Sequence, residues 1–190
     1  MPGPDGPTTR SRPEDGGAKV RIRPFLPHEF EVLWANWKTL YGPVYAPPEG
    51  ARASLRERFA RSGTFADGRL DLAIEVAGVL VGEVGARSIP TAMPPGVFEI
   101  GVGIFESSLH GRGYGTEAVR LITARLFDHE GAGRVQASTS VTNLAMRRAL
   151  EKAGFRHEGT LRGFWPGDGA REDYALYGIT ESDWAGRARA

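Results

Sequence analysis

The chain has 190 residues, of which 41% are hydrophobic and 25% charged, and its formal net charge is +1 at pH 7. This length suits one domain with a sizeable core, and the near-balanced charge gives no reason to expect nucleic acid or an anionic membrane as a partner. The absence of cysteine excludes disulfides and thiolate metal sites, and the four histidines show no metal-ligand spacing. Since no apolar run approaches the roughly 18 residues of a membrane span, and no signal-peptide core is present, a cytoplasmic protein is expected.

The N-terminal third begins with a segment of low hydrophobicity. Residues 1–17 are rich in Pro, Gly and charge, which predicts a disordered tail and leaves residues 18–190 as the domain. A half-buried strand is predicted around Val20 and Ile22, which alternate with charged residues. A helix follows, because apolar side chains recur at i, i+3, i+4 and i+7, namely Phe30, Leu33, Trp34 and Trp37. A short second helix is predicted over residues 53–62.

The remaining elements follow from apolar periodicity and turn residues. Two β-branched runs separated by Ala77-Gly78 predict a hairpin. Further strands are predicted at 97–105, 134–140, 159–165 and 171–179, and helices at 114–129 and 143–154. The fold class is therefore α+β (mixed α/β), with a single domain around one largely antiparallel sheet.

Three glycines occupy alternate positions where the helix at 114–129 begins: Gly111, Gly113 and Gly115. Glycine weakens regular structure, so this pattern indicates a ligand that approaches the main chain closely. The first turn of a helix offers unpaired N–H groups and partial positive charge, and Arg112 adds a cation that binds phosphate. We therefore predict a diphosphate site with Glu117 pointing away. The alternative is a tight strand-to-helix connection without a ligand.

Familiar nucleotide motifs do not fit this loop. Its spacing is GxGxG rather than the dinucleotide GxGxxG, and a Walker sequence is absent. In the preceding strand, Gly101 and Gly103 leave one side nearly bare apart from Glu99, and glycine in a strand often marks the close approach of a ligand. A long, thin ligand with amides and a terminal diphosphate would pair along this strand, and acyl-coenzyme A has that shape. A nucleotide-binding protein of another fold is the weaker alternative.

At these residues the chain resembles the GCN5-related N-acetyltransferase (GNAT) family, and within it the RimJ/RimL-like group that acetylates protein N-termini and small amines. The resemblance runs from about Val20 to Trp184. Its strongest part, IGVGIFESSLHGRGYGTEAVRLI, is similar to the family's pyrophosphate-loop motif, with His110 where the family has Gln or Arg. NLAMRRALEKAGF is similar to the family's Asn-containing helix, and DYALYGITESDW to the group's final strand and closing acidic residue and Trp.

The resemblance implies a GNAT-like domain that moves an acetyl group from acetyl-CoA to a primary amine, on a protein N-terminus or a small molecule, by direct attack in a ternary complex. It implies that the backbone of Val102 and Ile104 pairs with the pantetheine arm, and that Asn143 contacts the arm beyond the thioester. The alternative for Asn143 is a helix N-cap. The loop residues implied to bind the coenzyme are His110, Gly111, Arg112, Gly113, Tyr114, Gly115 and Thr116.

Acetyl transfer needs a base for the amine and hydrogen bonds for the developing oxyanion, and it benefits from a proton for the thiolate. Glu99 is the candidate base, because it shares the bare strand face with the two glycines; the alternative is an ion-paired strand carboxylate. Relatives carry a Tyr seven positions, or a Ser three positions, after the Asn, where this chain has Leu150 and Met146. Three interpretations stay open: an unassisted thiolate, a proton from Tyr114 or Tyr174, or a non-catalytic acyl-CoA-binding or sensor module.

The acceptor amine is expected to meet aromatic side chains. Trp34 and Trp37 of the first helix and Trp165 of the last hairpin are candidates for an aromatic wall, and the alternative for the first two is core packing. The expected partners are acetyl-CoA and an amine substrate, with neither nucleic acid nor a membrane. The chain is expected to be a monomer or a homodimer.

Overall fold

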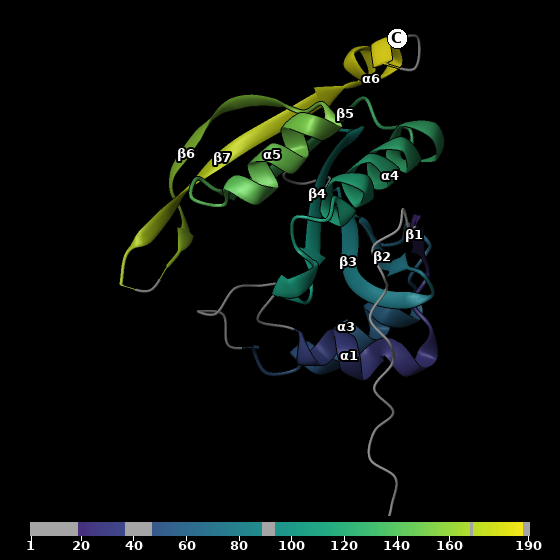
Figure 1. Cartoon of the computed structure of the whole chain (residues 1–190). Coiled ribbons are helices and arrows are strands. Elements are labelled where there is room, and N and C mark those ends of the chain that lie inside the picture. The colour runs from purple at the N-terminus through teal and green to yellow at the C-terminus, as the bar shows by residue number, and fades with distance from the viewer. Residues whose placement is uncertain (1–18, 37–46, 89–93, 168, 188–190) are drawn as a thin grey trace, which may run out of the picture.

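A computed structural model describes residues 19–36, 47–88, 94–167 and 169–187. Its centre is a seven-stranded sheet in the order β1-β2-β3-β4-β5-β7-β6, with helices on both faces (Figure 1). The strands are β1 Val20–Arg23, β2 Arg69–Val76, β3 Val79–Arg87, β4 Val97–Ile104, β5 Arg134–Ser140, β6 Arg156–Pro166 and β7 Arg171–Thr180. The helices are η1 Pro27–Glu29, α1 Phe30–Ala35, α3 Ala51–Ala60, η2 Ser107–Leu109, α4 Tyr114–His129, α5 Leu144–Ala153 and α6 Glu181–Arg187.

Neighbouring strands pair antiparallel except β4 and β5, which run parallel. The predicted α+β fold around one largely antiparallel sheet is therefore confirmed. The β2–β3 hairpin turns at the predicted residues, since Ala77 and Gly78 both adopt positive φ, at 50° and 79°. This is the backbone sign that a two-residue turn between twisted strands requires.

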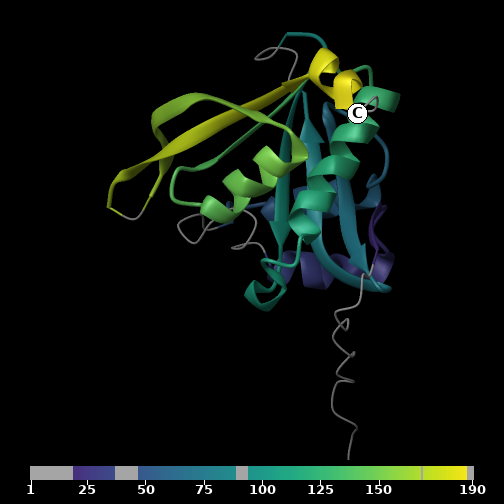
Figure 2. The same cartoon turned by 45° about the horizontal axis from the view of Figure 1, so that its top comes forward.

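Helices α4 and α5 lie side by side over one face of the sheet (Figure 2). The predicted apolar positions of α4, Val119, Ile122 and Leu126, are fully buried against the sheet. Gly154, in the left-handed region at φ 95°, ends α5 as a glycine C-cap. These two helices therefore hold the loops at their N-termini rigidly beside the edge of β4.

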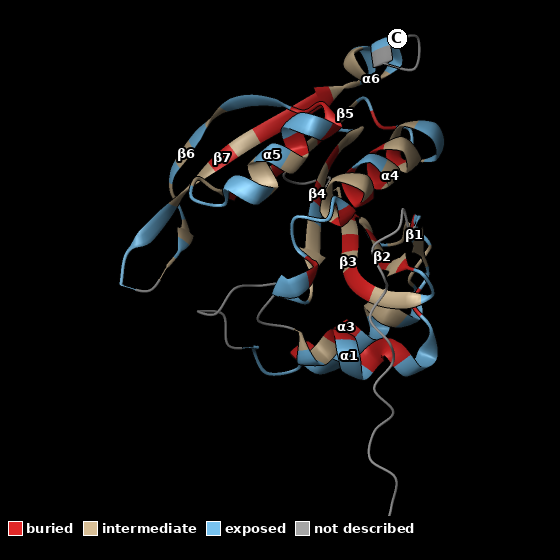
Figure 3. Cartoon of the chain, viewed as in Figure 1, coloured by how far each residue is buried: buried red, intermediate tan, exposed pale blue. Residues whose placement is uncertain are grey.

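Helices α1 and α3 pack on the opposite face. Their buried side chains Phe30, Leu33 and Leu55 form a second apolar cluster with Phe25 and with Ala73 of β2. The sheet is thus covered on both faces at its N-terminal half, where β2 and β3 are the most buried strands (Figure 3).

Strands β6 and β7 form a long hairpin, the hairpin arm, which extends away from the rest of the sheet (Figures 1 and 2). Its outer part is largely exposed, whereas Ala175, Tyr177 and Ile179 near its base are buried. The arm ends in α6, a helix that the periodicity did not predict. Trp184 of α6 stacks on Phe127 of α4, with ring centroids 5.7 Å apart.

Some sequence expectations fall outside the described residues. These are the disordered tail at 1–17 and the part of the first helix that carries Trp37. In the portions that the structure describes, every helix is too short or too polar to cross a membrane.

Candidate active site

The site begins where β4 separates from β5. The two strands pair over only three residue pairs, ending at Glu99 and Gln136, although β4 continues to Ile104 and β5 to Ser140. The sheet therefore opens beyond Glu99 and exposes one backbone edge of β4. An unpaired strand edge is a row of N–H and C=O groups that an extended ligand can pair with.

The backbone groups on this edge belong to the residues that the resemblance implies. In an antiparallel ladder, alternate residues point their N–H and C=O groups toward the partner strand. Phe105 N–H donates to the Val81 carbonyl at 3.0 Å, so Gly103 and Gly101 also face β3. Val102 and Ile104, between them, therefore turn their backbone groups toward the opening.

The glycine loop lies at the N-terminus of α4, beside this edge. Gly111 and Gly113 adopt φ of 76° and 85°, which side chains disfavour, and Gly113 is the N-cap of α4 without a side-chain cap. A Cβ added at Gly111, Gly113 or Gly115 would meet no atom within 4 Å. The loop backbone is thus open to a ligand, and this arrangement fits a diphosphate.

Polar side chains fix the loop against the strand. The His110 Nε2 lies 3.3 Å from the Ile104 carbonyl, so the residue at the family's Gln or Arg position bridges the loop and the end of β4. Arg112 donates from Nε to the Ser108 carbonyl at 3.2 Å. Glu117 is paired with Arg120 along α4, at 3.5 Å. A carboxylate neutralised in this way opposes a bound phosphate less than a free one would.

A cavity of about 490 Å³ adjoins the open edge of β4. One side is the face of β2, β3 and β4 turned away from α4, and the other is formed by β5, the start of α5 and the hairpin arm. The residues that line it include Arg69, Asp71, Glu83, Gly85, Arg87, Glu99, Gly101, Val102, Gly103, Ser138, Thr139, Asn143, Met146, Phe164, Trp165 and Tyr174. The opening, the glycine loop and the cavity are therefore continuous along β4.

Two of the predicted site residues have partners within the protein. Glu99 lies in the cavity wall and accepts a hydrogen bond from Arg87 at 2.9 Å, as in the alternative interpretation of an ion-paired carboxylate. Asn143 is the N-cap of α5, since its Oδ1 accepts from the Met146 N–H at 3.1 Å. It lines the cavity as well, so capping and ligand contact are compatible roles for this side chain.

At the two positions where relatives carry a Ser or a Tyr, this chain has side chains that pack in the core. Leu150 is fully buried, and Met146 packs against the same core while lining the cavity. Of the two tyrosines considered as donors, Tyr114 is buried within the core and Tyr174 lies in the cavity wall. Burial and the nearby Glu172 raise the pKa of Tyr174, so its phenol keeps its proton at neutral pH.

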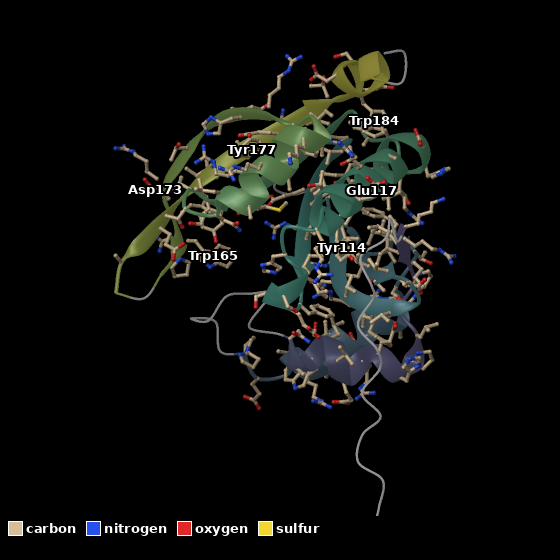
Figure 4. The ribbon with its side chains drawn as sticks, in the orientation of Figure 1. Tyr114, Glu117, Trp165, Asp173, Tyr177 and Trp184 are labelled. Atoms are coloured by element: carbon tan, nitrogen blue, oxygen red, sulfur yellow. The ribbon has the colours of Figure 1, made fainter. Side chains whose placement is uncertain are left out.

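The aromatic wall comes from the hairpin arm rather than from α1. Trp165 stacks on Tyr174 with ring centroids 5.8 Å apart, and both line the cavity with Phe164. Figure 4 shows Trp165 on the side of the arm that faces the body of the molecule. Trp34 packs against the second apolar cluster and lies under Arg52 at 5.3 Å, and it is not among the residues that line the cavity.

Comparison with known proteins places this geometry in context. A sequence profile described as the acetyltransferase (GNAT) domain matches residues 19–156. The probable N-acetyltransferase YjcK of Bacillus subtilis (strain 168) is 37% identical over 83 residues, which is 43% of this chain and 46% of that protein. The aminoglycoside N(6')-acetyltransferase type 1 of Klebsiella pneumoniae is 37% identical over 67 residues, or 35% of this chain and 33% of that protein. The chain spans less than two thirds of the length of these curated relatives.

Solved structures match over more of the chain. Mycobacterium smegmatis RimJ in complex with CoA-disulfide has a TM-score of 0.69 at 25% identity, covering 86% of this chain and 83% of that one. The aminoglycoside acetyltransferase AAC(6')-Ib in complex with coenzyme A has a TM-score of 0.69 at 20% identity, covering 90% and 100%. This second likeness is one of fold.

Proposed function

Because the chain belongs to the GNAT acetyltransferase family, we propose that it transfers an acetyl group from acetyl-CoA to a primary amine by direct attack in a ternary complex. The observation that carries the proposal is the opening between β4 and β5, which leads from the glycine loop of α4 into the cavity. We place the chain in the RimJ/RimL-like group of the family, which the likeness to M. smegmatis RimJ supports.

Acetyl-CoA, when bound, supplies an acetyl group that is activated as a thioester. In this proposal the N–H groups of residues 112–116 bind the diphosphate at the positive end of α4. Val102 and the N–H of Ile104 pair with the amides of the extended arm, and Asn143 contacts the arm near its reactive end. The Ile104 carbonyl already has His110 as a neighbour.

The amine would enter from the cavity, between the charged sheet face and the hairpin arm. Relatives named for RimJ and for aminoglycoside acetylation support amines as the acceptor class. Holding the amine and the acyl carbon in one geometry lowers the barrier by about 7 kcal/mol or more in favourable cases. Trp165 and Phe164 are the proposed aromatic contacts of the acceptor.

The test is release of free thiol from acetyl-CoA in the presence of a panel of peptides, polyamines, amino sugars and amino acids. We expect release with at least one acceptor, together with the mass of one acetyl group on that acceptor. Tight binding of acetyl-CoA by calorimetry with no release for any amine would favour the non-catalytic module instead.

A further inference from the structure

The floor of the cavity is one face of strands β2, β3 and β4. On this face, glycines leave open space next to the Glu83 carboxylate. Across β2, β3 and β4, Asp71, Gly85 and Gly101 form one row of the register, and Ala73, Glu83 and Gly103 form the next. A Cβ at Gly101 would meet no atom within 4 Å. Glu83 is therefore separated from the open part of β4 by glycines alone, and it lines the cavity.

Three carboxylates of this face line the cavity, and two of them are paired. Asp71 accepts hydrogen bonds from the guanidinium of Arg58 on α3, one of them at 3.1 Å from Nε. Glu99 is bound by Arg87 at 2.9 Å. The side-chain carboxylate of Glu83 forms no hydrogen bond or ion pair with any residue in the described ranges. Its oxygens are thus the acidic acceptors on this face that remain available to a ligand.

We infer that Glu83 is the general base of the reaction and takes the proton from the acceptor ammonium group. This inference rests on the proposed function. It gives Glu83 the role of base for which the sequence suggested Glu99. A carboxylate already bound to a guanidinium is a weaker base than an unpaired one, because the neighbouring cation stabilises its ionised form. The vacant space over Gly101 is where the amine would meet both Glu83 and the thioester.

Glu83 accepts one proton from the ammonium nitrogen and becomes a neutral carboxyl group. The freed lone pair forms the new C–N bond with the acetyl carbon, and the C–S bond breaks with its electron pair on sulfur. A second proton leaves the nitrogen and ends on the thiolate, which gives the amide and the free thiol. Glu83 then returns its proton to water.

The charges around Glu83 suit a base that works near neutral pH. Burial, followed by the nearby Asp71, raises the pKa of Glu83 to about 7, although Arg58 and Arg69 act in the opposite direction. Arg87 and Glu99 form an ion pair on the same surface, two rows away from Glu83. A base whose pKa lies close to the working pH combines a high ionised fraction with good proton affinity.

The test compares Glu83→Gln with Glu99→Gln over pH 5 to 10, using the best acceptor from the panel. For the wild type we expect kcat/KM to rise through about pH 7. Glu83→Gln should lose this ionisation and about a hundredfold in kcat, whereas Glu99→Gln should keep the ionisation. A less basic analogue of the acceptor, already neutral at pH 7, should recover most of the rate in Glu83→Gln, which a merely structural residue would not allow.

A second readout does not depend on turnover. Carbon NMR of the carboxyl groups in the coenzyme-free protein should show one resonance that titrates near pH 7 and is missing from Glu83→Gln. Titration of Glu83 near its ordinary pKa of 4.5 would overturn the inference. An active wild type and an unchanged dependence of kcat/KM on pH in Glu83→Gln would also overturn the inference. In that case the proposed function stands. Absence of thiol release from the wild type with every acceptor would remove both.

Discussion

At the scale of single residues, we propose that Tyr174 supplies the proton that Met146 and Leu150 cannot. It lines the cavity beside Trp165, and its raised pKa keeps the phenol protonated. Tyr114, the other tyrosine considered, is 7% exposed and belongs to the core. Of these two tyrosines, Tyr174 is therefore the one that lines the cavity, and for an active enzyme the alternative is a thiolate that leaves unassisted.

Replacing Tyr174 with Phe should lower kcat about tenfold to a hundredfold, because a positioned proton donor contributes at least that much to many enzymes. The acceptor KM should change little, since the ring that stacks on Trp165 is retained. Steady-state kinetics of Tyr174→Phe and Tyr114→Phe make the comparison. If both variants keep the wild-type kcat, the thiolate leaves without help from either phenol.

The sequence singles out Glu99 but not Glu83, and the reason is physical. Both lie on strands with alternating patterns, so local periodicity places each on a face without saying what stands opposite. The partners depend on register: Arg87 lies directly across from Glu99, whereas Glu83 faces Ala73 and Gly103. Only the folded sheet shows which carboxylate is left unpaired. The glycines at 82 and 85, flanking Glu83, were the available signal.

At the scale of elements, two glycines at the start of α4 have different roles. Gly113 holds a positive φ of 85°, whereas Gly115 lies within the first turn of the helix and has open space at its Cβ position. Gly113→Ala should destabilise the fold by about 1 kcal/mol and weaken coenzyme binding at least tenfold, since the loop must change shape. Thermal unfolding and calorimetry with coenzyme A measure the two effects.

Gly115→Ala is the matched variant. Alanine is the better helix former, so this change should stabilise the protein by about 0.5 kcal/mol. A Cβ at Gly115 meets no atom within 4 Å, so coenzyme affinity should stay within about threefold. Equal losses of affinity in both variants would show that the methyl group itself, rather than the backbone conformation, blocks the ligand.

Most elements follow from periodicity, and α4 is found at its predicted bounds, because its buried positions recur every third or fourth residue. The helix α6 was missed, since seven residues carry too little periodicity. Its signal was a capping pattern: the Asp183 N–H donates to Thr180 Oγ1 at 3.3 Å, and Asp183 Oδ2 accepts from the Thr180 N–H at 3.3 Å. Such a pair stops a strand and starts a helix within one turn.

At the scale of the whole molecule, the cavity exists because the hairpin arm stands opposite the sheet face of β2 to β4. The arm contributes Trp165, which is half-buried and stacked. Trp165→Ala should raise the acceptor KM about threefold to tenfold, the equivalent of one aromatic contact, with the Kd of coenzyme A unchanged. The control is Leu144→Ala, because Leu144 is an exposed apolar residue on α5 that does not line the cavity. A rise in both the acceptor KM and the Kd of coenzyme A in Trp165→Ala would indicate collapse of the hairpin arm instead.

Two carboxylates, the buried Glu29 and the partly buried Glu83, shape how stability depends on pH. Glu29 is bound by Arg23 at 2.7 Å, and this interaction lowers the pKa of Glu29 against the effect of burial. Its contribution is present above the pKa of the unfolded chain, about 4.5, and is lost as pH falls through the lower folded value. The acid side of the profile should therefore decline below about pH 4.5.

Glu83 acts in the opposite sense. Its folded pKa of about 7 exceeds the ordinary value of 4.5, so the folded state holds a proton that the unfolded chain has released. The free energy of unfolding should fall by about 3 kcal/mol as pH rises from about 4.5 to about 7, and then level off. Glu83→Gln should lose this slope and be the more stable protein at pH 8, whereas Glu57→Gln, an exposed carboxylate on α3, should keep it. Urea unfolding at pH 5, 6, 7 and 8 measures the slope. A wild-type stability that does not change between pH 5 and 8 would mean that the Glu83 carboxylate has a partner in solution. A paired carboxylate is a weaker base, so this result would contradict the role proposed for Glu83.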